Sequence, residues 1–99
     1  MSLTLRDAQH LSWKTFKKFE ALSKERSAVM GTGNDLVKKS SEIVEKLKAL
    51  ENSKANKSEV ENLISELLFS AFIFSERNGI NLEEAFLQTV DDIILSFVG

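Results

Sequence analysis

The sequence predicts an all-α protein, and three observations support that prediction. The 99 residues contain no proline and only four glycines, so little in the chain interrupts a helix. Apolar residues recur at intervals of three and four along most of the chain, which is the period of an amphipathic helix. No stretch alternates apolar and polar residues as a half-buried strand does. We therefore expect a single domain over residues 1–99, folded as a four-helix bundle.

The first helix is expected from about Thr4 to about Arg26. Thr4 is a suitable N-cap, and Asp7 three residues later completes a variant of the capping box. The helix would present one apolar stripe formed by Leu5, Ala8, Leu11, Phe16, Phe19 and Leu22. Residues 28–33, which contain two glycines, are expected to form a loop.

The second helix is expected to begin at Asn34 or Asp35 and to continue to about Leu50. The polar residues 51–57 are expected to connect it to the third helix. Ser58 and Glu61 form a capping box that would open this third helix, and Gly79 would end it in a left-handed conformation. Because residues 63–74 are apolar almost all round, we expect the third helix to be buried on several sides.

The fourth helix is expected to start after Asn81, which takes the serine role in a capping box with Glu84. Its apolar stripe is formed by Leu82, Ala85, Phe86, Val90, Ile93, Ile94 and Phe97. Seven phenylalanines and one tryptophan leave so short a chain with surplus apolar surface. Since soluble monomers rarely expose large apolar patches, we expect a homo-oligomer, either a dimer or a tetramer.

Composition excludes several functions. A net charge of −2 gives no basic field for binding duplex nucleic acid. The absence of cysteine excludes disulfides, thiolate zinc sites and cysteine nucleophiles. The first residues lack the apolar core of a signal peptide, and the longest apolar run, residues 67–74, is far short of the ~20 residues that span a bilayer. We expect a cytoplasmic protein that makes no use of a membrane.

Carboxylates are the remaining candidates for chemistry, because the sole histidine, His10, is expected at the surface. Glu42 and Glu45 are three residues apart and would share one helix face. Glu66 lies among residues expected to be buried, where a carboxylate costs free energy unless it is paired or bound to metal. Glu76 is nearly in line with Glu66 on the same helix. Acidic residues on neighbouring helices could build a Mg²⁺ site.

Three stretches of the chain resemble the MazG-like nucleotide pyrophosphohydrolase family. They are residues 3–9, residues 36–43, and residues 67–86 with their Gly-Ile-x-Leu-Glu-Glu-Ala turn, which is the most specific of the three. The resemblance implies an all-α, dimeric or tetrameric, Mg²⁺-dependent enzyme with a four-helix bundle completed by homodimerisation. It also implies cleavage of a nucleoside triphosphate to the monophosphate and pyrophosphate.

The family's acidic metal ligands are retained only in part. The first pair falls on Lys39 and Glu42, and the second pair falls on Leu63 and Glu66, while a later asparagine falls near Glu76. Two acidic ligands of four therefore remain, and Lys39 would repel a metal ion or pair with Glu42. The resemblance thus implies metal ligation by Glu42 and Glu66, assisted by Glu45 and Glu76.

Four alternatives remain open at this point. A register shift would make Glu42 and Glu45 the first metal-binding pair, and Lys38 and Lys39 could contact substrate phosphates directly. The chain could also be a non-catalytic relative that retains the fold and the oligomer and binds nucleotides or proteins. Finally, it could be a structural helical bundle whose apolar face binds a partner helix.

Overall fold

The computed structural model describes residues 2–52 and 57–98, and all regular structure in these ranges is α-helical. The helices are α1 (Leu5–Leu22), α2 (Lys24–Val29), α3 (Gly33–Asn52), α4 (Lys57–Arg77) and α5 (Leu82–Val98). The all-α prediction is therefore confirmed. Residues 53–56, which belong to the predicted polar connection, lie outside the described ranges. No helix in these ranges is both long enough and apolar enough to cross a bilayer.

Three predicted helix ends are confirmed, two by hydrogen bonds and one by its backbone conformation. The Thr4 hydroxyl accepts from the Asp7 N–H, and the Asp7 carboxylate accepts from the Thr4 N–H, so the capping box at α1 is complete. Gly79 follows α4 with φ of +65°, which is the left-handed conformation expected at a helix C-terminus. At α5 the Asn81 side chain accepts from the Glu84 N–H.

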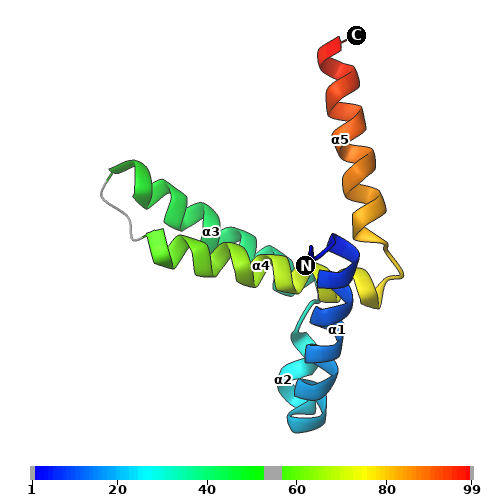
Figure 1. Ribbon diagram of the computed structural model, residues 1–99. Helices are drawn as coiled ribbons and strands as arrows, with labels where there is room; N and C mark the ends of the chain where they lie inside the picture. The colour runs from blue at the N-terminus through cyan, green and yellow to red at the C-terminus, as the bar shows by residue number, and fades with distance from the viewer. Residues whose placement is uncertain (1, 53–56, 99) are drawn as a thin grey trace.

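The predicted first helix is broken in two, which corrects the expected single helix from Thr4 to Arg26. Ser23 lies between α1 and α2 with extended backbone, and its hydroxyl accepts from the Arg26 N–H. A serine hydroxyl can cap a helix wherever the backbone turns, and here it starts a new helix that folds back beside α1. The break lets α2 cover one side of α1 (Figure 1).

Two other predicted boundaries are wrong by a few residues. The loop expected over residues 28–33 is confined to residues 30–32, because α2 extends to Val29 and α3 begins at Gly33. Thr32 rather than Asn34 or Asp35 caps α3, since its hydroxyl accepts from the Asp35 N–H at 3.2 Å. Ser58, the predicted cap of the third helix, lies inside α4.

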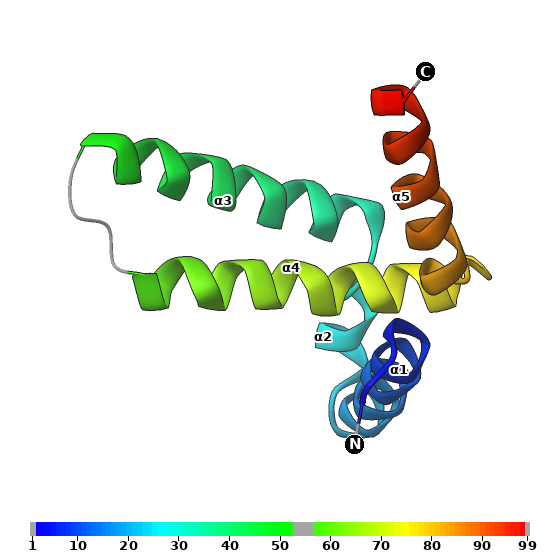
Figure 2. The same ribbon diagram turned by 45° about the horizontal axis from the view of Figure 1, so that its top comes forward.

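Helix α4 is the centre of the fold. It packs against α3 in an antiparallel hairpin on one side and against α1 on the other (Figure 2). The buried apolar core is formed by Phe16 of α1 with Phe72 and Ile73 of α4. Trp13 stacks on Phe16 with ring centroids 5.2 Å apart, which extends this core along α1.

The expectation that α4 is buried on several sides holds only near its C-terminal end. Phe72 and Ile73 are buried there, but Ile64 and Leu68 in the preceding turns are about half exposed. The reason is that α1 crosses only the C-terminal part of α4, so the other part of this helix is covered by α3 alone (Figures 1 and 2).

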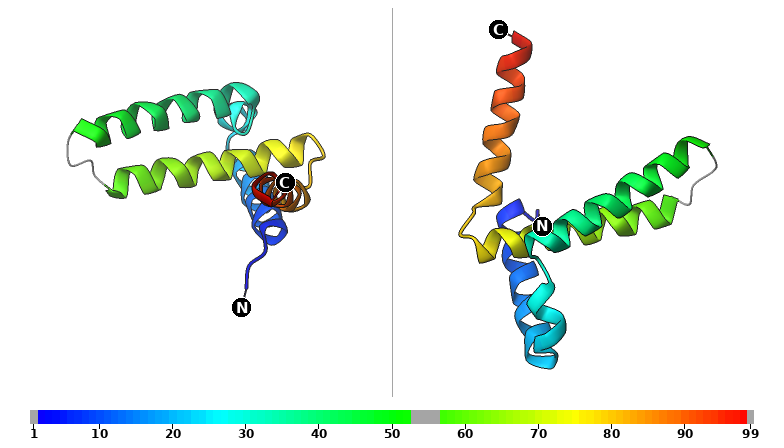
Figure 3. Two further views of the ribbon diagram at one scale, coloured as in Figure 1. Left: turned by 90° about the horizontal axis from the view of Figure 1, so that it is seen from above. Right: turned by 180° about the vertical axis from the view of Figure 1, so that it is seen from behind.

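A single chain does not close into a compact bundle. Its radius of gyration is 15.8 Å, whereas a compact chain of this length has about 13 Å. The α3–α4 hairpin, the α1–α2 pair and α5 point in three different directions from the end of α4 (Figure 3). Helix α5 makes its main contact with α1 and carries the C-terminus away from the rest of the chain.

Candidate functional site

The α3–α4 hairpin holds its two helices in one antiparallel register. Near the open end, Lys46 of α3 forms an ion pair with Glu59 of α4 at 2.6 Å. Near the other end, Ser70 of α4 lies beside Asp35 of α3 and helps to lower the pKa of its carboxyl group. Both contacts define the same antiparallel register. Lys46 and Asp35 are 11 residues apart on α3, and their neighbours Glu59 and Ser70 are 11 residues apart in the opposite direction on α4.

This register brings together the four positions that the family resemblance assigns to metal ligands. It places Lys39 opposite Glu66, and both line one open hollow of about 480 Å³. It places Glu42 opposite Leu63, and both line a neighbouring hollow of about 430 Å³. Two carboxylates, one ammonium and one apolar side chain therefore occupy adjacent positions across the hairpin.

One expectation from the sequence was that Lys39 pairs with Glu42. The structure pairs Lys39 with Asp35 instead. Its Nζ lies 2.7 Å from Oδ1 of Asp35, one turn earlier on α3, and both side chains are largely buried. The Asp35 carboxylate also accepts from the Gly31 N–H at 2.9 Å. Lys39 is thus a fixed cation inside the hollow that Glu66 lines, and its charge is partly balanced by Asp35.

The environment of Asp35 favours its charged form. Burial alone would raise the pKa of this carboxyl group, but hydrogen bonds from Lys39, Gly31 and Ser70 and the charge of Lys39 hold the pKa below its ordinary value of 3.8. The carboxylate therefore stays ionised at neutral pH and serves as the anchor of Lys39.

The burial predicted for Glu66 is wrong. Glu66 is exposed, and so are the nearby Ser65 and Leu68. Because the buried face of this part of α4 is turned only toward α3, a side chain next to apolar residues in sequence can still point to solvent. No burial cost therefore demands a counter-ion or a metal at Glu66.

The two assisting glutamates lie in different places. Glu45 lines the hollow of Glu42 together with Lys38, and its own contact is an exposed ion pair with Lys48 at 3.9 Å. Glu76 is ten residues from Glu66 on α4, which is a separation of about 15 Å along the helix. The two carboxylates cannot share one metal ion at that distance, so Glu76 is excluded from a site that contains Glu66.

No acidic cluster suited to a resident metal forms in the described ranges. Among residues 2–52 and 57–98, no group of three or more histidine, aspartate or glutamate side chains is placed to hold one ion. Glu42 and Glu66 line two neighbouring hollows and not one shared hollow.

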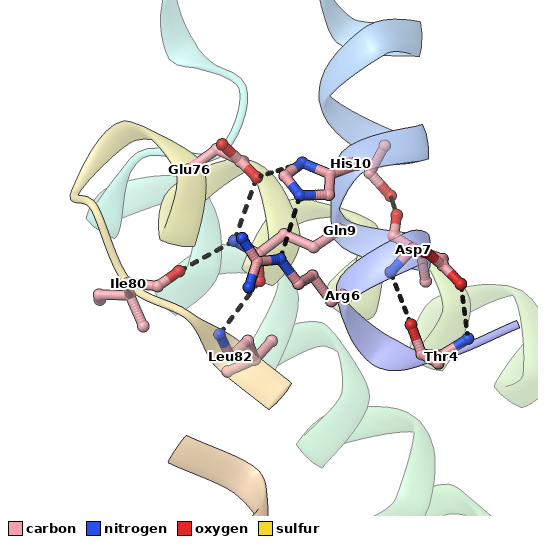
Figure 4. Close-up of polar contacts among 10 residues, drawn as sticks. Thr4, Arg6, Asp7, Gln9, His10, Glu76, Ile80 and Leu82 are labelled. Carbon is pink, nitrogen blue, oxygen red and sulfur yellow. Dashed lines mark hydrogen bonds and ion pairs between the residues drawn. The ribbon is translucent and has the colours of Figure 1, made fainter. Parts of the chain in front are cut away.

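Glu76 instead belongs to a polar cluster that joins α1 to the turn between α4 and α5 (Figure 4). Gln9, only 6% exposed, donates to Glu76 at 3.2 Å and to the Ile80 carbonyl at 2.9 Å. Its amide oxygen accepts from the Leu82 N–H at 3.1 Å, so one side chain fixes the start of α5. Nδ1 of His10 lies 3.4 Å from the Glu76 carboxylate at the rim of this cluster.

Gln9 was not among the candidate functional residues predicted from the sequence. It lies outside the apolar stripe predicted for the first helix, and its three partners are more than 60 residues away in the chain. The one local signal is its position directly after the apolar Ala8 on an otherwise amphipathic helix, which places it at the edge of the buried face.

We expect the Gln9→Ala substitution to destabilise the fold by about 1–2 kcal/mol. The change leaves the Leu82 N–H and the Ile80 carbonyl without their partner, and an unsatisfied polar group at a packed contact costs this amount. Gln88→Ala is the matched control, because Gln88 is exposed and, among the described residues, its side chain bonds only to Asp92 on its own helix. Urea unfolding followed by circular dichroism should show a loss for the first variant and a change within about 0.5 kcal/mol for the second.

Comparison with protein-family models, with curated proteins and with solved structures finds no match for this chain.

Proposed function

We propose that this chain is a divergent nucleotide pyrophosphohydrolase related to the MazG-like family. It would work as a homo-oligomer, bind a Mg²⁺–nucleoside triphosphate on the α3–α4 hairpin, and release monophosphate and pyrophosphate at a reduced rate. The observation that supports the proposal is the hairpin register, which groups Lys39, Glu42, Leu63 and Glu66, the four positions that the sequence resemblance assigns to metal binding.

The residues at these positions suit a nucleotide that brings its own cation. Glu42 and Glu66 offer hard oxygen ligands from two facing helices. Lys38 and Lys39 lie in the same pair of hollows and would contact phosphate oxygens, and Lys39 is already held in place by Asp35. Mg²⁺ bound with the triphosphate would neutralise phosphate charge and lower the pKa of a water molecule.

The same residues explain why the rate should be reduced. Lys39 and Leu63 stand where the resemblance expects carboxylates, so half of the acidic ligands are replaced. A lysine can stabilise charge on a phosphate, but it cannot hold a metal ion or accept a proton while it is charged.

We expect the protein to release pyrophosphate from at least one nucleoside triphosphate in the presence of Mg²⁺. Glu66→Ala should lower that rate at least about 100-fold, because a metal-assisted step loses several kcal/mol of stabilisation without its ligand. Glu61→Ala is the matched control, since Glu61 is an exposed glutamate of α4 that pairs only loosely with Lys57, at 3.8 Å. The assay measures pyrophosphate with a panel of nucleotides.

The remaining outcomes are equally informative. A nucleotide-dependent rise in melting temperature without pyrophosphate release would contradict hydrolysis and leave a nucleotide-binding protein. If the protein shows no pyrophosphate release and no nucleotide-dependent rise in melting temperature, nucleotide binding is rejected altogether. Equal effects of Glu66→Ala and Glu61→Ala would reject the assigned site.

A second candidate function is supported by a separate observation. The apolar side chains of α5 are exposed, and the described residues contain no acidic trio for a metal. Both features suit a non-catalytic homo-oligomeric module that retains the helical fold and serves protein interaction. The absence of any nucleotide effect in the assay above would favour this candidate.

A further inference from the structure

A further open hollow lies away from the hairpin, where α1 and α2 meet the C-terminal end of α4. Its volume is about 490 Å³, and three basic side chains line it, one from each helix: Lys17, Lys24 and Arg77. Arg77 is 11 residues from Glu66, which is a separation of about 16 Å along α4. This hollow is therefore separate from the candidate nucleotide site.

Arg77 is held in place on one side of the hollow. Its Nε donates to the Met30 carbonyl at 3.2 Å, and its Nη2 donates to the Ser27 carbonyl at 3.0 Å. The guanidinium carbon lies 4.9 Å from the centroid of the Phe16 ring, which adds a cation–π contact. Carbonyls and an aromatic ring orient the guanidinium group but carry no negative charge. The cation is therefore fixed in position without being neutralised.

Lys17 is oriented by similar contacts on α1. Its Nζ lies 4.9 Å from the centroid of the Trp13 ring, and it forms an ion pair with Glu20 at 3.1 Å. Trp13 in turn stacks on Phe16. Lys17 and Arg77 therefore contact the two members of one aromatic pair, and this pair helps to hold both cations at the hollow.

The hollow has more positive than negative charge. Among the described residues, Glu20 is the one acidic side chain that lines it, against three basic ones. Neither Lys24 nor Arg77 has an ion-pair partner within residues 2–52 and 57–98. Residues 14–26 carry five basic and two acidic side chains, although the whole chain has a net charge of −2. This end of the molecule would therefore attract an anion.

We propose that this hollow binds the phosphate group of a small ligand, with Lys17, Lys24 and Arg77 as its contacts. A phosphate group with a charge of about −1.5 to −2 matches the two positive charges that Glu20 leaves unbalanced, whereas a carboxylate would balance only one. Its oxygens can accept from an ammonium and a guanidinium group at the same time. Because Lys17 and Arg77 are already held in place, binding costs little side-chain entropy there. The site lies outside the proposed nucleotide hydrolysis and does not depend on it.

Trp13 makes this site observable, because it is the sole tryptophan and contacts Lys17. In Mg²⁺-free buffer, we expect inorganic phosphate and inorganic pyrophosphate to change the fluorescence of Trp13 in a saturable way, while sodium acetate at the same ionic strength does not. Lys24→Gln should raise the dissociation constant for phosphate at least about 10-fold, because a charge-assisted hydrogen bond is lost. Isothermal titration calorimetry measures the same constants without the fluorescence signal.

Lys18→Gln is the matched control. It removes the same charge from α1, but Lys18 lies about 100° around the helix from Lys17 and does not line the hollow. We expect its dissociation constant for phosphate to stay within about twofold of the wild-type value, because salt screens an exposed charge that makes no direct contact. Lys18 and Lys24 are both exposed, so circular dichroism should show that both variants are folded.

Equal losses in Lys24→Gln and Lys18→Gln would overturn the site, because they would show only a diffuse attraction between charges. The absence of a saturable response to phosphate and pyrophosphate, or an equal response to acetate, would also overturn it. Loss of phosphate binding in Lys39→Gln but not in Lys24→Gln would place the anion in the hairpin hollow instead.

A nucleoside monophosphate distinguishes the sources of the phosphate group. Tighter binding than that of inorganic phosphate, sensitive to Lys24→Gln, would support the site and identify a nucleotide as its ligand. Equal affinity would support the site with the free anion as its ligand. None of these titrations measures pyrophosphate release, so the failure of this site and the failure of the proposed function are distinguishable.

Discussion

Gly31→Ala is expected to destabilise the protein by about 3–4 kcal/mol, the largest loss from a single added methyl group. Gly31 has φ of +69°, a backbone conformation that costs a residue with a side chain about 1–2 kcal/mol. A Cβ at this position would also lie 2.6 Å from Cβ of Ile73, which is fully buried. Neither the backbone at Gly31 nor the buried Ile73 side chain can move freely, and overpacking of a core costs about 1–3 kcal/mol more.

Gly79→Ala separates these two contributions. Gly79 has nearly the same φ, +65°, but a Cβ there would meet no atom within 4 Å. We expect this variant to lose only about 1–2 kcal/mol, from the backbone conformation alone. Thermal and urea unfolding of both variants should show the difference. Equal losses would mean that the close approach of Gly31 to α4 does not constrain the fold.

The helical fold was predictable because its signals are local. The capping residues Thr4, Gly79 and Asn81 act within one turn of their own helix ends, and each is confirmed by a hydrogen bond or a dihedral angle. The break at Ser23 was missed because a serine inside an amphipathic pattern is compatible with both a continuous helix and a new cap.

The burial of individual side chains could not be predicted in the same way. Glu66 stands between apolar neighbours in sequence, but only one face of that part of α4 is covered. Gln9 depends on three partners that only the folded chain brings near it. Which face of a helix is covered depends on the helices around it, and periodicity alone does not identify them.

For the candidate site, the sequence predicted which positions lie near one another but not which side chains pair. The sequence pointed to Glu42 and Glu66 on neighbouring helices, and the hairpin register brings their positions into adjacent hollows. The expected role of Lys39 changed, because its partner is Asp35 and not Glu42. The pairing follows from the burial of both side chains beside Ser70, which no short pattern in the sequence reveals.

Asp35→Ala is expected to cost about 3 kcal/mol at neutral pH. Asp35 is 13% exposed and Lys39 24% exposed, so the substitution leaves a largely buried ammonium without its counter-ion. It also removes the acceptor of the Gly31 N–H. Unfolding in urea at pH 7 measures the loss. Asp91→Ala, an exposed aspartate on α5, should change stability by no more than about 0.5 kcal/mol.

The loss should depend on pH with a defined sign. Because folding lowers the pKa of Asp35 below 3.8, the carboxylate contributes its full stabilisation above that pH and loses it as the pH falls through the lowered pKa. The wild-type protein should therefore lose stability through this group as the pH falls below 3.8 and through the lowered pKa, while Asp35→Ala lacks that component. The difference in unfolding free energy between the two proteins should shrink as the solution is acidified. A difference that stays constant with pH would show that the ion pair with Lys39 does not stabilise the hairpin.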